Sequence, residues 1–263
     1  MAVDKKNGFL ELKNVSKSFG GLQAVRGLSF HVEEGEIFSL IGPNGAGKTT
    51  ALNLITGVYQ PTSGEIHLLN RRLTRRKPHQ IAQMGIARTF QNIQLFKNMT
   101  VRENVMVGQH IRTRSGFLRC LFKTPLTRKE ENLVREKTEE VLEFLGLLSV
   151  ADVPAESLPY GIQKQIEIAR ALSAEPRVLL LDEPVAGLNM KETEEMSRMI
   201  LKIRQRDITI ILVEHDMNLV MEISDTITVL NYGKKIAMGC PREIQCDPNV
   251  IEAYLGWEAE KIC

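Results

Sequence analysis

A glycine-rich run at residues 42–50 carries the clearest chemistry in this chain. It follows an apolar stretch, Ile37–Ile41, that predicts a buried strand, and it reads Gly42-Pro43-Asn44-Gly45-Ala46-Gly47-Lys48-Thr49-Thr50. Its glycines let backbone N–H groups turn inward, and a helix that begins here directs its positive dipole end to the same point. Lys48 adds a mobile positive charge for the β and γ phosphates, and the Thr49 hydroxyl is placed to bind magnesium. This P-loop pattern predicts a nucleoside triphosphate site rather than a chance glycine-rich turn.

Two adjacent carboxylates form the second chemical element. The apolar residues 178–181 predict a strand that ends at Asp182 and Glu183. In a parallel α/β sheet, ligands bind at the carboxyl ends of the strands. Asp182 is then placed to hold magnesium through a water molecule, and Glu183 to polarise the water that attacks the γ phosphate. Acids that merely end a strand are the alternative, and their position after a P-loop favours the catalytic interpretation.

Short apolar strands alternate with helical patterns around these elements, which is typical of an α/β protein. The early strands predict an antiparallel edge, the later ones a mostly parallel core sheet, and the middle of the chain an inserted helical subdomain. The predicted strands are 10–15, 28–32, 65–69, 178–181, 208–213 and 226–230, and the predicted helices are 48–56, 100–109, 128–145, 191–206 and 216–223.

The composition bounds the class of protein. The chain has 263 residues, of which 43% are hydrophobic and 25% charged, so it is long enough for one large domain or a domain with a subdomain. No segment approaches the ~18 apolar residues that span a bilayer, and residues 1–8 lack the apolar core of a signal peptide. We therefore expect the chain to stay in the cytosol. Its net charge of +2 is too small to indicate a nucleic-acid partner.

Two segments, residues 71–77 and 112–129, are nevertheless locally basic. A solvated face or loop is the ordinary explanation for each. Contact with anionic lipid head groups, worth about 1 kcal/mol per close basic residue, is the alternative for the second. The cysteines form no CxxC pair, as expected for reduced thiols in a cytosolic protein; they are Cys120, Cys240, Cys246 and Cys263.

A third segment completes a pattern that resembles the ATP-binding subunits of ABC transporters. It reads Leu158-Pro159-Tyr160-Gly161-Ile162-Gln163 and continues through residues 164–172, similar to the signature segment of that family and its helix. The order of P-loop, signature and Asp-Glu strand is specific to the family. The resemblance covers nearly the whole chain. It implies one ABC ATPase domain at residues 9–255, with a helical subdomain inserted at about 92–174 and a C-terminal tail at 256–263.

The resemblance also implies roles for single residues. Phe19 matches the aromatic residue that stacks on adenine, and His215 matches the switch histidine near the γ phosphate. Gln91 matches the glutamine that links the nucleotide and its magnesium to the helical subdomain, and Tyr160 and Gly161 match signature positions that bind nucleotide. The implied catalytic residues are Lys48, Gln91, Glu183 and His215, and the implied magnesium ligands are Thr49, Gln91 and Asp182.

Each of these positions has an ordinary alternative when it is taken singly. Phe19 could be a core residue, as most aromatic residues are. His215 could be a histidine whose hydrogen bonds are satisfied at a strand end. Gln91 alone carries no signal. Only their order and spacing within the full pattern favour the functional interpretation.

The signature departs from the common Leu-Ser-Gly-Gly-Gln form. Pro159 replaces the serine, so the hydroxyl that would hydrogen-bond the γ phosphate is missing. Tyr160 stands for the first glycine and Ile162 for the glutamine, whereas Gly161 is retained. A glycine N–H and a helix N-terminus remain as an anion site, and we expect a working but weakened half-site. Asn189 replaces the usual aspartate of the inter-subunit loop, and keeps hydrogen bonding without the charge.

Finer resemblance points to importers for branched-chain amino acids. It rests on residues 19–25, 87–92, 186–189 and 248–256, and on the Tyr-Gly form of the signature. It implies ATP and Mg²⁺ as cofactors, and a head-to-tail dimer with a second ATPase subunit, identical or related. It further implies two membrane permeases, an external solute-binding protein that acts indirectly, and a place on the cytoplasmic face of the inner membrane. The solute stays open, because relatives for urea or other amides look alike.

Two other classes share the core motifs. One is the ATPase of an exporter or of a lipopolysaccharide-transport complex, which differs mainly in its permease partners. The other is a soluble ABC ATPase that acts in translation or DNA repair. Proteins of that second class usually carry two nucleotide domains or a long coiled-coil insertion, and this chain has room for neither.

Overall fold

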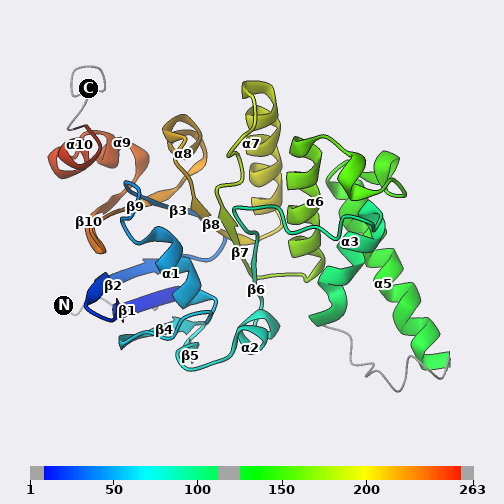
Figure 1. The fold of residues 1–263 in the computed structure, drawn as a ribbon, viewed down its shortest axis with the longest axis horizontal. Helices are drawn as coiled ribbons and strands as arrows, with labels where there is room; N and C mark the ends of the chain where they lie inside the picture. The colour runs from blue at the N-terminus through cyan, green and yellow to red at the C-terminus, as the bar shows by residue number, and fades with distance from the viewer. Residues whose placement is uncertain (1–8, 112–124, 256–263) are drawn as a thin grey trace, which may run out of the picture.

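Two sheets lie beside each other in the computed structural model, which describes residues 9–111 and 125–255 (Figure 1). The smaller sheet is antiparallel, in the order β2-β1-β4-β5, and the larger has the order β10-β9-β3-β8-β7-β6. The strands of the smaller sheet are β1 (Leu10–Phe19), β2 (Leu22–Val32), β4 (Ser63–Leu68) and β5 (Arg71–Arg72). Those of the larger sheet are β3 (Ile37–Ile41), β6 (Ile86–Arg88), β7 (Val178–Asp182), β8 (Thr209–Val213), β9 (Thr226–Asn231) and β10 (Lys234–Gly239).

The larger sheet is parallel except at one edge, where β10 runs antiparallel to β9. Every residue of β3, β7 and β8 is buried. Strands that are covered on both faces are almost continuously apolar, which is the pattern that these three segments show. The predicted α/β class, with a mostly parallel sheet and an antiparallel β edge, is therefore confirmed.

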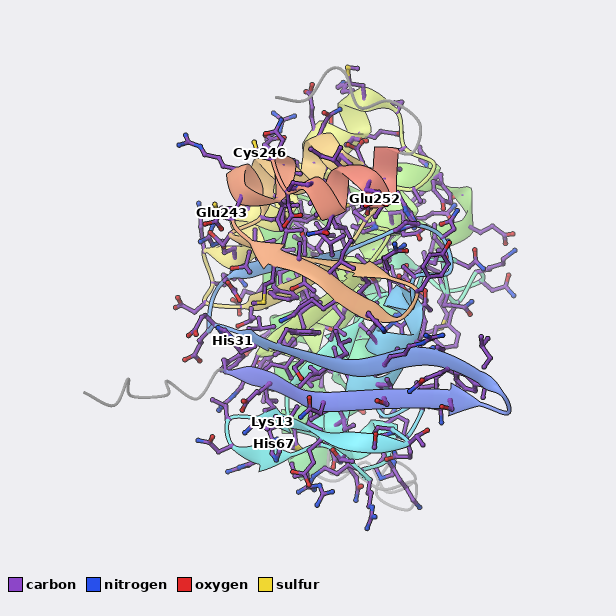
Figure 2. All side chains as sticks on the ribbon, turned by 90° about the vertical axis from the view of Figure 1, so that its left-hand side faces the viewer. Lys13, His31, His67, Glu243, Cys246 and Glu252 are labelled. Atoms are coloured by element: carbon purple, nitrogen blue, oxygen red, sulfur yellow. The ribbon has the colours of Figure 1, made fainter. Side chains whose placement is uncertain are left out.

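Helices cover both faces of the larger sheet. In Figure 1, α1 lies between the two sheets, α7 and α8 stand above the larger sheet, and α3, α5 and α6 form a group at the right. Figure 2 shows that α9 and α10, β10, the β1–β2 hairpin and β4 lie one above another at the opposite end. The helices are α1 (Lys48–Ile55), α2 (Pro78–Gln83), α3 (Val101–Gly108), α5 (Pro125–Phe144), α6 (Tyr160–Ser173), α7 (Met190–Arg204), α8 (Met217–Ile223), α9 (Pro241–Gln245) and α10 (Pro248–Leu255).

The side chains of the larger sheet alternate between two cores. Leu180 and Ile211 face a core that also contains α1 and the antiparallel sheet. Leu179 and Ile210 face a second core, formed with α3, α6 and α7. Because both faces of these strands are packed in this way, the ends of the strands are held rigidly, and side chains placed there have fixed positions.

The predicted elements have shifted ends. β1 and β2 are longer than predicted because they pair along a hairpin that closes from Phe19 to Leu22. Thr100 lies outside α3 as its N-cap, where its hydroxyl accepts a hydrogen bond from Glu103 N at 3.2 Å. Strand β6 has only three residues, too few to show a periodicity, and was not predicted.

Most of the basic segment 112–129 lies outside the described residues, which include only its last part, within α5. Among the described residues, no helix combines the length and the apolar character needed to cross a bilayer.

Candidate active site

Four neighbouring parallel strands bring the predicted residues to one edge of the sheet. β3 leads into the P-loop, and β8, β7 and β6 follow it in spatial order. β7 ends at Asp182, which pairs with Val213 of β8, and Arg88 at the end of β6 pairs with Leu180 of β7. The residues that follow these strands therefore meet at the carboxyl edge, where ligands bind in α/β sheets.

The P-loop has a backbone that only glycine tolerates at two points. Gly42 has φ +151°, and a Cβ there would lie 2.2 Å from Leu230 O. Gly47 has φ +105°, and a Cβ there would lie 2.7 Å from Ala24 O. Gly47 is also the N-cap of α1, with no side-chain cap and no acidic residue in the first turn of the helix. The first N–H groups of the helix are therefore available to bind an anion.

Lys48 is folded back into the loop that carries it. Its Nζ donates hydrogen bonds to the carbonyl oxygens of Gly42 at 2.6 Å and Pro43 at 3.1 Å, and the residue is 6% exposed. Burial lowers the pKa of Lys48, and the carboxylates of Glu183 and Asp182 oppose that shift. The next residue, Thr49, is exposed in the first turn of α1.

The Glu183 carboxylate is held from both sides. Gln91 Nε2 donates to Glu183 Oε2 at 2.8 Å, and His215 Nε2 lies 2.8 Å from Glu183 Oε1. Glu183 itself has φ +51°, a left-handed conformation that is uncommon for a residue with a side chain. Three predicted residues, from the ends of three different strands, are thus joined in one cluster.

Asp182 is buried against a cation that the sequence did not single out. Arg88 donates from one terminal nitrogen to Asp182 Oδ2 at 2.7 Å and from the other to Asn53 Oδ1 at 2.6 Å. The side chains of Arg88 and Asp182 are 7% and 5% exposed. Arg88 thereby ties the end of β7 to α1, the helix that carries Lys48. The sequence feature that could have identified Arg88 is its position three residues before Gln91.

A second overlooked residue is Glu214. Its carboxylate accepts hydrogen bonds from Val185 N at 2.8 Å and from His215 N at 2.9 Å. Burial raises the pKa of Glu214, and the backbone hydrogen bonds partly offset this. Glu214 therefore fixes the loop after Glu183 relative to His215.

Phe19 stands at the tip of the β1–β2 hairpin and is not a core residue. Its ring packs edge-on against Tyr59, with centroids 5.0 Å apart, and is 39% exposed. Lys17 Nζ lies 5.0 Å from the centre of the same ring. The exposed aromatic surface is available for stacking on a planar ligand.

The signature residues lie apart from the P-loop of their own chain. α6, which begins at Tyr160, and α1 are separated in Figure 1 by β7 and β8. Tyr160 covers Gly187, where an added Cβ would meet the ring at 3.3 Å. Gly161 is buried beside Glu192. Asn189 is the N-cap of α7, since its Oδ1 accepts from Glu192 N at 3.1 Å.

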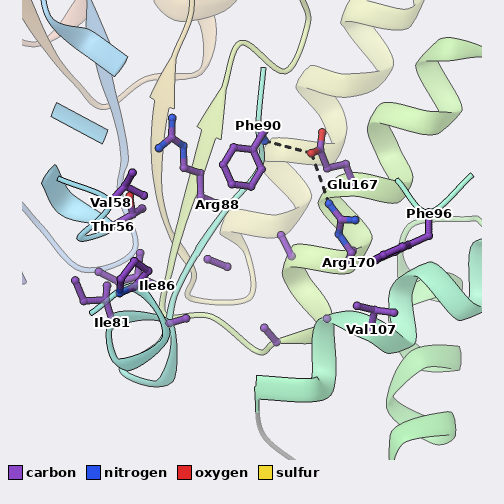
Figure 3. A pocket seen from close by; sticks show the side chains of 16 residues that line it. Thr56, Val58, Ile81, Ile86, Arg88, Phe90, Phe96, Val107, Glu167 and Arg170 are labelled. Atoms are coloured by element: carbon purple, nitrogen blue, oxygen red, sulfur yellow. Dashed lines mark hydrogen bonds and ion pairs between the residues drawn. The ribbon is translucent and has the colours of Figure 1, made fainter. Parts of the chain in front are cut away.

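A cavity of about 430 Å³ lies between the sheet and the helical group (Figure 3). Apolar side chains from both sides line it, among them Val58, Phe96 and Val107. Glu167 accepts a hydrogen bond from Phe90 N at 3.2 Å and pairs with an Arg170 nitrogen at 3.7 Å (Figure 3). The cavity therefore combines an apolar lining with buried charge, and Arg88 is one of its lining residues.

The family model described as ABC transporter matches residues 25–186, and that described as branched-chain amino acid ATP-binding cassette transporter matches residues 234–256. The chain belongs to the ABC transporter family. This ABC transporter subunit is an ATPase, and it binds nucleotide. The resemblance noted in the sequence is confirmed.

Known ABC proteins resemble the chain along most of its length. The high-affinity branched-chain amino acid transport ATP-binding protein BraF of Pseudomonas aeruginosa is 48% identical over 94% of this chain and 97% of its own. A solved ABC transporter cassette in an ADP conformation is 35% identical, with a TM-score of 0.83 over 95% of this chain and all of the other. A dimeric cassette bound to ADP and phosphate is 26% identical, with a TM-score of 0.74 over 89% and 99% of the two chains.

Proposed function

We propose that the chain is the ATP-hydrolysing subunit of an importer for branched-chain amino acids. The observation that carries this proposal is the 48% identity with BraF, which extends over nearly the full length of both chains. The C-terminal match at residues 234–256 supports the same subfamily. There are two alternatives. One is the ATPase of an exporter or of a lipopolysaccharide-transport complex, and the other is a soluble ATPase that acts on nucleic acid or ribosomes.

Nucleotide binding is assigned to residues 42–50 and Phe19. The backbone N–H groups of the P-loop and the first turn of α1 would hold the phosphates. Lys48, which now donates to two loop carbonyls, would turn to the β and γ phosphates when they arrive. Phe19 would stack on the adenine ring. Replacing Lys48 by alanine should weaken nucleotide binding itself.

Magnesium is assigned to oxygen donors around the same point. Asp182, whose Oδ2 also accepts from Arg88, would hold the ion through a water molecule. Thr49 would supply a hydroxyl, and Gln91 an amide oxygen that remains available because its nitrogen donates to Glu183. The described residues contain no group of three His, Cys, Asp or Glu side chains able to enclose a metal ion. Such a set of few, hard donors fits Mg²⁺, which keeps water and substrate phosphates in its coordination shell. Bound magnesium would neutralise phosphate charge.

Hydrolysis is assigned to the cluster of Glu183, Gln91 and His215. Glu183 would orient and polarise the attacking water as general base. Gln91 and His215 hold its two carboxylate oxygens and so fix its direction, and the His215 side chain is 43% exposed. This geometry supports a carboxylate whose direction is fixed by the chain's own side chains.

A head-to-tail dimer is proposed because Tyr160 and Gly161 lie away from the P-loop of their own chain. The dimeric cassette among the solved relatives supports this arrangement. The signature would then serve the ATP of a partner subunit, through the N–H groups at the start of α6. Because Pro159 has no hydroxyl to offer, a dimer with a different ATPase subunit should have unequal sites. Equal turnover at both sites would count against this.

The permease contact is assigned to the cavity in Figure 3. The cavity lies between the sheet and the helical group, and its lining includes Phe90 and Phe96, which lie on either side of Gln91 in the sequence. An apolar segment of a membrane protein would fill it. The chain would accordingly lie at the cytoplasmic face of the membrane, where the permeases expose such segments. An external solute-binding protein would act only through those permeases.

The test is a gentle detergent pull-down of the tagged chain from its native membranes, with partners identified by mass spectrometry. ATPase activity is then followed as solute-loaded binding proteins are added. Two permeases, a second ATPase and stimulation by a leucine-loaded binding protein are expected. Exporter-type membrane partners would support the first alternative, and recovery with ribosomes or DNA alone would support the second.

A further inference from the structure

Lys164 is a buried lysine that the proposed mechanism does not use. It lies in the second turn of α6, 3% exposed. Its Nζ donates hydrogen bonds to the backbone carbonyl oxygens of Gln91 at 3.1 Å and of Glu183 at 3.2 Å. These are the two residues whose side chains are bonded to each other in the proposed catalytic cluster.

The Glu183 carbonyl is the more consequential of the two partners. Glu183 has the left-handed conformation described above, which costs about 1–2 kcal/mol in an ordinary residue. A conformation of this kind persists only where surrounding contacts hold it. Glu183 N donates to Val213 O at 2.8 Å, and Lys164 fixes the carbonyl at the other end of the residue. The direction of the side chain, set between these two bonds, depends on both.

Lys164 also belongs to the signature segment. It is four residues after Tyr160, hence on the same face of α6, and its Nζ lies 5.8 Å from the centre of the Tyr160 ring. Tyr160 in turn covers Gly187, in the loop that follows Glu183. One rigid helix therefore carries both the residues expected to meet the partner's nucleotide and the ammonium group that holds Glu183.

A structural ion pair does not explain why Lys164 is buried. No carboxylate accepts a hydrogen bond from Lys164 within the described residues, although Glu167, Glu214, Glu183 and Asp182 all attract it at longer range. Both hydrogen bonds go instead to backbone carbonyls on two separate loops. A buried ammonium group loses its hydration, so it depends on these two carbonyls as hydrogen-bond acceptors. The two hydrogen bonds therefore hold the loops in place.

We propose that Lys164 is a positioning residue that ties the placement of the signature helix to the orientation of the Glu183 carboxylate. A shift of α6, when the signature meets the partner's nucleotide, would move Nζ relative to both carbonyls and so realign Glu183 and Gln91. Nucleotide bound at the partner's site would thereby change the alignment of the hydrolytic residues in each subunit. This inference rests on the proposed function, in which Glu183 is the base and the signature serves the partner.

The test compares Lys164→Met with Lys164→Arg in the assembled transporter. Loss of the ammonium group should lower kcat about 10- to 100-fold, the scale expected when a reacting group is displaced by about 1 Å. KM for ATP and ATP affinity should change less than about twofold, because no P-loop contact is lost, and arginine should restore most of kcat. Lys137→Met, which removes a partly exposed lysine of α5, is the matched control and should leave turnover unchanged.

A double-mutant comparison separates positioning from general damage. If Lys164 acts through Glu183, Lys164→Met should add less than about threefold to the loss caused by Glu183→Gln in single-turnover hydrolysis. Fully multiplied losses, or normal kcat in Lys164→Met, would overturn the inference. Lys164→Gln, which removes the ammonium charge but keeps a polar side chain, should also lower kcat and replaces the methionine variant if that variant does not assemble. Normal turnover by Glu183→Gln would instead show that the base was wrongly assigned.

Discussion

Replacing Arg88 by methionine should destabilise the subunit strongly. The side chains of Arg88 and Asp182 are 7% and 5% exposed, and their ion pair measures 2.7 Å. Methionine fills a similar volume but leaves the Asp182 carboxylate buried without a cation and Asn53 without its donor. Breaking a buried pair from one side costs about 3–5 kcal/mol. In a chain of this size that corresponds to a fall of roughly 6–20 °C in Tm.

The assay is urea unfolding of the nucleotide-free subunit, followed by circular dichroism. The matched control is Arg72→Met, which breaks an ion pair with Glu65 whose side chains are 48% and 44% exposed. That variant should lose less than about 1 kcal/mol, because exposed pairs contribute little. Adding Asp182→Asn to Arg88→Met should recover part of the loss, since the unpaired charge is removed. If Arg88→Met unfolds within about 1 kcal/mol of the unmodified chain, Asp182 does not depend on Arg88 and the argument from burial fails.

Three further outcomes follow from the site. Glu183→Gln should retain ATP binding but lower kcat by about 10²- to 10⁴-fold, measured by phosphate release, and normal turnover would remove Glu183 as the base. Gly187→Ala should cost about 1–2 kcal/mol in urea unfolding, because φ is +81° there and the Tyr160 ring lies against the new methyl group; an unchanged midpoint would contradict this. Burial raises the pKa of Glu167 above 4.5, so the folded state binds its proton more tightly than the unfolded state, and stability from this group is lost as pH rises through the raised pKa. The free energy of unfolding of Glu167→Gln, measured in urea, should therefore rise relative to that of the unmodified chain as pH rises above about 4.5. A constant difference between the two chains across that range would refute the raised pKa.

The sequence predicted the parts of the site that are contiguous in the chain. The P-loop needs particular residues at fixed spacing between a strand and a helix, and so does the pair Asp182–Glu183, so both were visible. The contact of Arg88 with Asp182 joins residues 94 positions apart through the neighbouring strands β6 and β7. No local spacing encodes strand order, and β6 is too short to show a pattern. The resemblance named Gln91 and His215, but only the folded chain reveals that both hold Glu183.

Glu214 and Lys164 were overlooked for a different reason. Each is charged yet buried, whereas charged residues are usually assigned to the surface when a sequence is read alone. Their positions follow from backbone groups that need partners, namely Val185 N, His215 N and the carbonyls of Gln91 and Glu183. The need of these backbone groups for hydrogen-bond partners cannot be predicted from the pattern of side chains in the sequence.

The hydrogen bonds of Lys48 to Gly42 and Pro43 bear on how quickly the site can be reused. They brace the P-loop from within, so that contacts of the chain itself set the shape of the loop. The conformational entropy of ordering these residues is then lost once, when the chain folds, rather than in every cycle. Binding of a nucleotide would then require the displacement of one side chain, Lys48, rather than the ordering of the whole loop.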